Sequence, residues 1–224
     1  MDRETFLERV RSALEVSELP LIPEGPPGGL VPDLPGAGVT ERFMEQVEAV
    51  DGHTHRVGSD DEAVHLIGAL LEQYGATSYL GWDPDHLPIS GLAERLRATS
   101  LGAVVPGDAE GRLEQQSGYM DLLVGITGAS AGLAESGSIV LESGPGRPRM
   151  ASLIPLVHIA LLRKQDITQS LSHWIADHPE AASDTSNLFM ITGPSRTADI
   201  EQTLNLGVHG PKHLHVVVVA SSRF

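Results

Sequence analysis

Glu135 is the first candidate for chemistry in this chain. It stands in the run Glu135, Ser136, Gly137, Ser138, between two apolar segments. A carboxylate in that position would lie close to a sheet, where it is costly to leave unpaired, so Glu135 is a candidate acid, base or nucleophile. The alternative is a structural role, because the same carboxylate can accept backbone N–H bonds in the turn before Ile139.

The segment before Glu135 reads as a strand that ends in small residues. An apolar run leads into Thr127, Gly128 and Ala129. Small residues let backbone N–H groups approach a ligand, and open α/β sheets bind ligands at the carboxyl ends of their strands. The alternative is that Ala129, Ala131, Gly132 and Ala134 only let a short helix pack closely on the sheet. The predicted ligand contacts of this segment are Thr127, Gly128, Ser130, Ser136, Gly137 and Ser138.

A second segment offers an anion site. A strand predicted to end at Thr192 turns through Gly193, after which Ser195 or Thr197 can cap a following helix. The free N–H groups of that helix N-terminus, with Arg196 beside them, suit a phosphate or a small carboxylate. We therefore predict Gly193, Ser195, Arg196 and Thr197 as ligand contacts.

Acidic residues argue against a bound anion there. Asp199 and Glu201 complement the helix dipole themselves, so the first turn can be electrically satisfied without a ligand.

His209, in a Gly-Val-His-Gly-Pro turn, is a candidate proton carrier, although a turn histidine bonded to nearby backbone is the commoner outcome. Each segment follows a predicted strand, which places one site where residues 127–138 meet residues 193–201.

Two pairs of histidines alternate along predicted extended segments. His53 and His55 would project from one face of a strand, as in some metal sites, but no third ligand follows at a recognisable spacing. His213 and His215 repeat the pattern at the start of the last strand, where a solvated strand end is the simplest interpretation. No metal site is therefore predicted.

Residues 144–149 form a basic turn that suits an acidic ligand or partner, or is simply solvated.

The elements that must position these residues alternate between helical and β-rich patterns. Such alternation is typical of crossover units that feed a mainly parallel sheet, and it indicates an α/β fold. The final run, Val216 to Val219, is apolar on both faces and belongs inside the sheet. After an N-terminal helix, helices are predicted at residues 41–50, 60–74, 92–99, 167–177 and 198–204, and strands at residues 78–82, 102–105, 122–127, 138–142, 153–161, 187–191 and 213–220.

The chain divides into an arm and one domain. Residues 1–38 hold an amphipathic helix with Phe6 and Val10 on one face, followed by a segment rich in proline and glycine that sustains neither a helix nor a central strand. Residues 39–224 form the α/β domain. The arm can pack on its own domain or reach a partner.

Composition excludes several classes of function. The net charge of −15 would repel a nucleic-acid backbone, so nucleic acid is not expected as a partner. With no cysteine, this chain alone holds no iron–sulfur cluster, and electrons would have to travel on a flavin, a nicotinamide or another subunit. The first residues do not read as a signal peptide and no membrane span is expected, which predicts a cytoplasmic protein.

Two blocks resemble the lactate utilization protein C family, whose members carry an LUD domain. They are GITGASAGLAESGSIVLESGPGRPRMASLIPLVHI and ITGPSRTADIEQTLNLGVHGPKHLHVVVV. With the surrounding alternation, the resemblance covers about three quarters of the chain. It implies a three-layer fold with a mainly parallel sheet between helices, similar to the NagB/RpiA/CoA transferase-like group.

The resemblance also implies a role in oxidising L-lactate to pyruvate with iron–sulfur partner proteins; the cofactor stays unknown. Coenzyme A transferases of the wider fold group use a glutamate followed closely by glycine as a nucleophile, and Glu135-Ser136-Gly137 is similar in type, though the middle serine departs from that pattern. A third reading is a non-catalytic assembly subunit that binds a small carboxylate or a nucleotide. A homodimer is compatible with all three readings.

Overall fold

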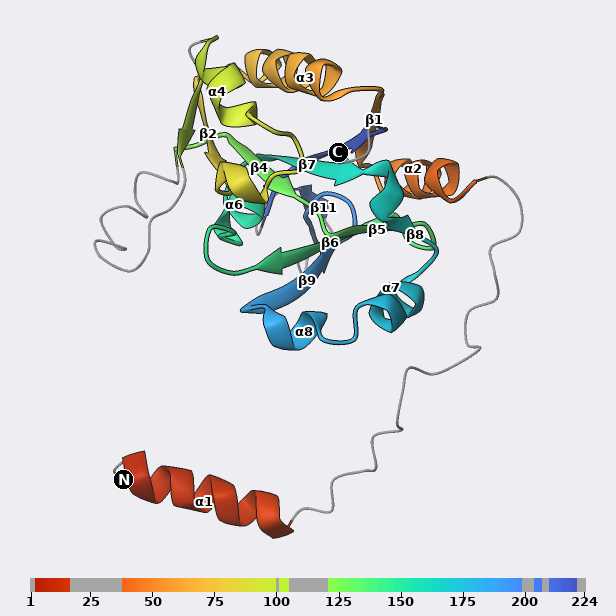
Figure 1. Ribbon diagram of the computed structural model, residues 1–224. Helices are drawn as coiled ribbons and strands as arrows, with labels where there is room; N and C mark the ends of the chain where they lie inside the picture. Colours follow the sequence, from red (N-terminus) through yellow and green to blue (C-terminus); the bar gives the residue numbers. More distant parts are fainter. Residues whose placement is uncertain are drawn as a thin grey trace. The chain divides into compact units, whose positions relative to one another are not determined.

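The structure is a computed structural model that describes residues 3–16, 38–99, 101–104, 121–198, 204–206 and 210–220 (Figure 1). The chain divides into two compact units, residues 1–30 and 31–224. The first contains helix α1 (Arg3–Val16), which confirms the predicted N-terminal helix, and within it Phe6 and Val10 are exposed. All the other described elements belong to the second unit.

A six-stranded sheet organises the second unit. Its order is β1-β12-β7-β4-β2-β3, and all of its pairings are parallel. β12 is paired on both sides and its valines are buried, which confirms the internal position predicted for this apolar run. The strands are β1 (His53–Val57), β2 (Ser78–Gly81), β3 (Gly102–Val104), β4 (Val124–Gly128), β7 (Val157–Arg163) and β12 (His213–Val219).

Helices cover this sheet. α3 (Asp60–Gln73) and α4 (Leu92–Arg97) lie over one face in Figure 1. α3 begins where the Ser59 side chain accepts a hydrogen bond from the Glu62 N–H, and its helical spacing buries Ala63, Ile67 and Leu70 on the sheet. α2 (Val39–Ala49) packs against β1, and α6 (Met150–Leu153) packs against β4 and β7.

A second, four-stranded sheet lies toward the other face of the main sheet (Figure 1). Its order is β8-β5-β6-β9, with β6 antiparallel to both of its neighbours. Its strands are β5 (Ala131–Leu133), β6 (Ser138–Ser143), β8 (Ile167–Thr168) and β9 (Asn187–Ile191), and α7 (Leu171–Asp177) and α8 (Ala181–Asp184) flank it. β10 (Arg196–Ala198) and β11 (Leu204–Leu206) form a separate antiparallel pair. Short 3-10 helices η1 (Pro84–His86) and η2 (Lys164–Asp166) follow β2 and β7.

The predicted α/β class with a mainly parallel sheet flanked by helices is confirmed, while the second sheet was not predicted. Within the described segments, no helix has the length and apolar character needed to cross a membrane.

The helix predicted at residues 198–204 is wrong at its two ends, which are the parts of it that the structure describes. Ala198 and Leu204 face each other in the antiparallel ladder of β10 and β11, so both are extended. The helix N-terminus that would have bound an anion beside Arg196 is therefore absent at these residues. The capping pattern misled because serine and threonine also suit turns and strand entries.

Three further boundaries differ from the prediction. The small residues after Gly128 form strand β5 rather than a short helix, because they pair with β6 and β8. Leu153 belongs to α6, so the predicted strand from residue 153 begins only at Val157. The helix predicted from Ile167 begins at Leu171, after β8.

Candidate functional site

A polar pocket lies at the carboxyl edge of the main sheet. It has a volume of about 350 Å³ and receives residues that follow three parallel strands. Trp82 follows β2, Gly128 ends β4, and Asp166 comes after β7. This edge is where open α/β sheets bind ligands. The lining comprises Trp82, Asp85, His86, Pro88, Gly128, Ala129, Ser130, Glu142, Arg147, Gln165 and Asp166.

Backbone contacts join two turns on one side of this pocket. The Asp83 N–H donates to the Gly146 carbonyl at 2.8 Å, and Trp82 Nε1 donates to the Pro148 carbonyl at 3.3 Å. Gly146 has a left-handed φ of 70°, and a Cβ there would lie 2.7 Å from His86 Cδ2. Only glycine fits this conformation and this contact. The turn that carries Arg147 is thus held against the turn that carries His86.

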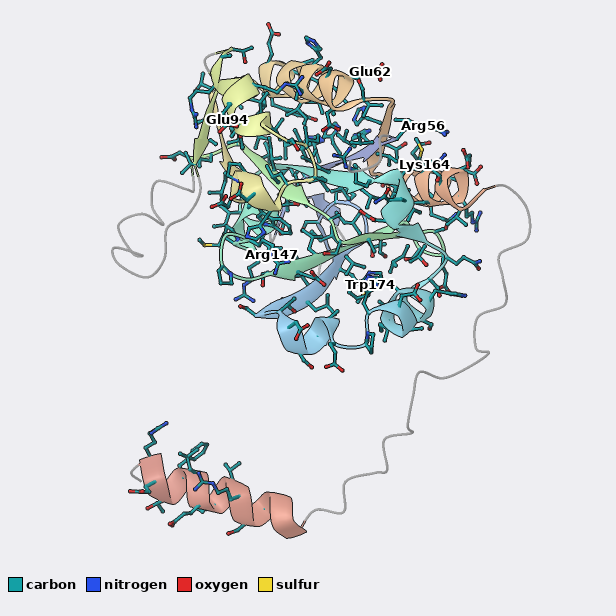
Figure 2. All side chains as sticks on the ribbon, viewed as in Figure 1. Arg56, Glu62, Glu94, Arg147, Lys164 and Trp174 are labelled. Atoms are coloured by element: carbon teal, nitrogen blue, oxygen red, sulfur yellow. The ribbon has the colours of Figure 1, made fainter. Side chains whose placement is uncertain are left out.

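Arg147 is paired inside the pocket. Its Nη1 lies 3.2 Å from Glu142 Oε2, and the two side chains are 24% and 19% exposed. Figure 2 labels Arg147 beside the end of the second sheet. Its Nε is buried and has no hydrogen-bond partner within the described parts of the chain. A guanidinium has five donor hydrogens, so Arg147 can hold a ligand carboxylate together with Glu142.

The pocket combines one cation with an imidazole and several carboxylates. Arg147 supplies donors for a carboxylate or phosphate, and His86 can accept a proton from a ligand hydroxyl. Asp85, Glu142 and Asp166 lower the affinity for a free anion. A small ligand that presents both a carboxylate and a hydroxyl group fits this set best.

A larger groove of about 890 Å³ runs between α3 and α4. It lies near the amino ends of β2 and β3, and its lining is mostly apolar. Its titratable lining residues are His65, Glu72 and Arg95, and Arg95 already pairs with Asp61, so the groove is a weaker candidate for binding a carboxylate.

Thr127 lies beneath the pocket rather than on its surface. Its side chain is fully buried, and its Oγ1 lies 2.8 Å from His158 Nε2 on the neighbouring strand. Burial lowers the pKa of His158 to about 3, so the ring is neutral at pH 7. Gly128 and Ser130 do line the pocket, and direct contact with a ligand stays a prediction for them.

Replacing Thr127 with valine is expected to lower the free energy of unfolding by about 1–3 kcal/mol. Valine keeps the shape but leaves the His158 imidazole without its hydrogen bond, since Nδ1 already has no partner among the described residues. Urea unfolding at pH 7, followed by circular dichroism, measures the loss. Thr54→Val, on edge strand β1, is the control and should change the value by less than about 0.5 kcal/mol; an equal effect of both changes would contradict this role for Thr127.

Glu135 is exposed at the tip of the hairpin between β5 and β6. The expectation of a carboxylate close to the sheet is therefore wrong, because the hairpin turns Glu135 toward solvent. Its N–H donates to the Gln169 carbonyl at 2.8 Å, which holds the turn in place. Gly137, with φ of 68°, packs against the backbone of Gln46, where a Cβ would lie within 2.4 Å.

Ser138, at the end of the first predicted segment, meets Thr192, just before the second, at a cluster of hydroxyl groups. Ser138 Oγ lies 2.7 Å from both Ser136 Oγ and Thr192 Oγ1. Gly193 follows, packed on the Val50 carbonyl. This hydroxyl cluster lies at the opposite end of the β5–β6 hairpin from Ser130, so the structure divides the predicted single site into two places.

The remaining predicted contacts lie on β10 or beyond the described residues. Ser195 donates its backbone N–H to the Pro211 carbonyl at 2.8 Å, and Arg196 and Thr197 belong to β10. His209 lies outside the described residues, and so do Asp199 and Glu201.

Sequence reasoning missed Trp82, His86 and Glu142 as pocket residues. It had singled out the basic turn that contains Arg147. The sequence does hold a signal for this part of the pocket. The polar turn Asp83-Pro84-Asp85-His86 follows the carboxyl end of β2, where open α/β sheets bind ligands.

His53, His55, His213 and His215 come together on β1 and β12. Within the described parts of the chain, no three histidine, aspartate or glutamate side chains are arranged to hold a metal ion.

Comparison with known proteins gives the family. A family model described as the LUD domain matches residues 40–219. Lactate utilization protein C of Halalkalibacterium halodurans is 35% identical over 163 residues, which are 71% of this chain and 70% of that protein. Lactate utilization protein C of a Geobacillus species is 31% identical over 189 residues, or 80% of this chain and 78% of that protein.

A solved structure shows the same fold. The crystal structure of a DUF162 family protein from Deinococcus radiodurans superposes with a TM-score of 0.55 at 20% identity, covering 81% of this chain and 96% of that one. The family match spans the main sheet, the second sheet and the polar pocket. The chain belongs to the lactate utilization protein C family of LUD-domain proteins.

Proposed function

We propose that this chain takes part in the oxidation of L-lactate to pyruvate, together with iron–sulfur partner proteins. The relatives named lactate utilization protein C support a role in lactate utilization. The absence of cysteine from its 224 residues supports the division of labour, because cysteine-held clusters would have to sit on other chains.

The polar pocket is the proposed lactate site, and the observation that carries this proposal is the joining of Arg147 and His86 on adjacent turns. Lactate is a 2-hydroxy acid, so its recognition needs a cation for the carboxylate and an acceptor for the hydroxyl proton. Arg147 supplies the first and His86 the second. Because three carboxylates surround the pocket, we expect weak, about millimolar, affinity.

Oxidation of lactate releases two protons and two electrons. In the proposed site, the hydroxyl proton passes to His86, while Arg147 holds the carboxylate and so fixes which face of C2 is presented. The two electrons and the remaining proton leave through a redox carrier held by another subunit. This chain's part is therefore binding, orientation and proton transfer.

A reconstituted assay tests the proposal. L-lactate oxidation with a dye acceptor is measured for this chain alone, for the iron–sulfur partners alone and for the mixture. Activity in the mixture only is the expected result. Equal activity of the partners without this chain would reduce the chain to an assembly or regulatory role.

Glu135 carries the alternative proposal of a nucleophile like that of coenzyme A transferases. Its exposed position on the hairpin leaves the carboxylate open to a reactant. Glu135→Gln distinguishes the two proposals, with exposed Glu72→Gln as the matched control. We expect lactate oxidation by the mixture to change less than about twofold in both variants. Coenzyme A exchange by this chain alone that disappears in Glu135→Gln would favour the transferase instead. A role for His209 as proton carrier stays a proposal.

A further inference from the structure

Four histidines of two neighbouring strands share one face of the main sheet. β1 and β12 pair in parallel with His53 opposite His215, so the alternation of side chains places His55 and His213 on that same face. The ring centroids of His53 and His215 are 4.9 Å apart, and those of His55 and His215 are 5.2 Å apart. The rings are stacked, and this group is named the histidine cluster.

A chain of hydrogen bonds runs through the histidine cluster. His55 Nε2 lies 2.9 Å from His215 Nδ1, and His215 Nε2 lies 2.9 Å from the Tyr74 hydroxyl. A neutral imidazole has one donor and one acceptor, so the chain is fully satisfied when both rings are neutral. If both rings are protonated, two N–H donors face each other across the His55–His215 contact. The His55–His215 pair therefore accommodates at most one proton beyond those that its two neutral rings already carry.

The strand beside the histidine cluster is apolar at the matching positions. On β7, beside β12, Val157 and Ile159 stand opposite His213 and His215. The neighbouring cation is Lys212, which itself disfavours charge on His213.

Charged groups of the packed helices lie elsewhere. α3 contributes Tyr74 at its end, while Glu72 is exposed and lines the groove toward α4. On α2, Glu41 pairs with Arg56 and Glu48 accepts from Thr54, both on the opposite face of β1. Asp51, just before β1, is exposed.

Protonation of His55, His213 and His215 is unfavourable in the folded state. Burial, followed by the charges of His55, His53 and His213, lowers the pKa of His215 to about 3. Burial likewise lowers the pKa of His55 and of His213. An unfolded histidine titrates near pH 6.5. The stabilisation by neutral rings is therefore complete above about pH 6.5 and is lost progressively as the pH falls toward 3.

We propose that the histidine cluster is an acid-sensitive latch that holds edge strand β1 on β12. β1 lies at the end of the strand order, so β12 is its sole ladder partner among the described strands. Protonation of more than one ring separates the strands locally. β1 continues from α2, whose backbone supports the Gly137 turn, so opening of the latch also loosens that turn.

Hydrogen exchange of the full-length chain at pH 7.5 and 5.0, corrected for intrinsic exchange rates, tests the latch. Protection of the amides of residues 53–57 is expected to fall at least tenfold more than that of residues 157–163 of β7. Equal loss in β1 and β7, or no loss in either, would overturn the proposal.

A variant that lacks two of the four imidazole rings provides the matched test. His53→Gln with His213→Gln keeps the His55–His215–Tyr74 hydrogen bonds and is expected to reduce the selective loss in β1 at least threefold. His65→Gln, on the exposed face of α3, should leave the loss unchanged. An undiminished loss in the double variant would overturn the proposal. If the double variant does not fold, NMR titration of wild-type His215 decides: protonation near pH 6.5 would overturn the latch, and a neutral ring down to pH 5 would support it.

Discussion

Gly125→Ala is expected to destabilise the fold by about 3 kcal/mol or more. Gly125 is the second residue of β4, and a Cβ there would be 1.8 Å from the Ala151 carbonyl oxygen and 2.9 Å from Pro155 Cγ. Both contacts belong to the α6 region, which would have to move away from the sheet. Because β4 leads directly to Gly128 in the polar pocket, the same movement should reduce ligand binding. Urea unfolding followed by circular dichroism measures the loss of stability.

Gly68→Ala is the matched control for this prediction. Gly68 lies within α3, and a Cβ there would meet nothing within 4 Å. Alanine favours the helix by about 0.5–1 kcal/mol over glycine, so this variant should be slightly more stable than the wild type. A Gly125→Ala variant within about 0.5 kcal/mol of the wild type would show that α6 does not restrict β4 as described.

Several helices and strands could be predicted because the spacing of their apolar residues fits either the helical or the strand period. β9 occupies the predicted residues 187–191, and α3 begins at Asp60, the first residue of the predicted helix. β12 was recognisable because four consecutive valines suit a strand buried on both faces. The secondary structure of these segments is therefore evident from their local sequence.

Other elements depend on contacts distant in sequence. β1 reads as the polar run His-Thr-His-Arg-Val, and it becomes a strand because β12 offers it a parallel edge and stacked histidine partners. β5 holds only three residues and is fixed by pairing with β6 and by the close approach of Phe43. Local patterns cannot reveal such strands, which explains why the second sheet was missed.

The candidate site was predicted in part. The sequence indicated the carboxyl end of β4, and Gly128 and Ser130 line the pocket there. His86 comes from η1 and Glu142 from β6, and their meeting depends on the backbone contacts of Gly146, which no single segment reveals. Glu135 looked buried because apolar runs flank it, but a hairpin turns its tip to solvent.

Arg147→Gln is expected to lower kcat/KM for L-lactate oxidation about 10- to 100-fold. Glutamine keeps a polar side chain but removes the positive charge, and a charge-assisted hydrogen bond contributes about 1.5–3 kcal/mol. The loss should appear mainly as a raised KM, because the guanidinium binds the carboxylate in both ground state and transition state. A urea midpoint close to that of the wild type checks that the loss of the Glu142 partner has not unfolded the pocket.

The kinetic constants of three proteins, each mixed with the same iron–sulfur partners, test the central claim most directly: the wild type, Arg147→Gln and Arg149→Gln. Arg149 is exposed and two residues away, so its loss removes the same charge from the same turn without changing the pocket lining. We predict a raised KM for Arg147→Gln and wild-type constants for Arg149→Gln. Wild-type constants for both variants, or equal losses in both, would contradict the assignment of lactate to this pocket.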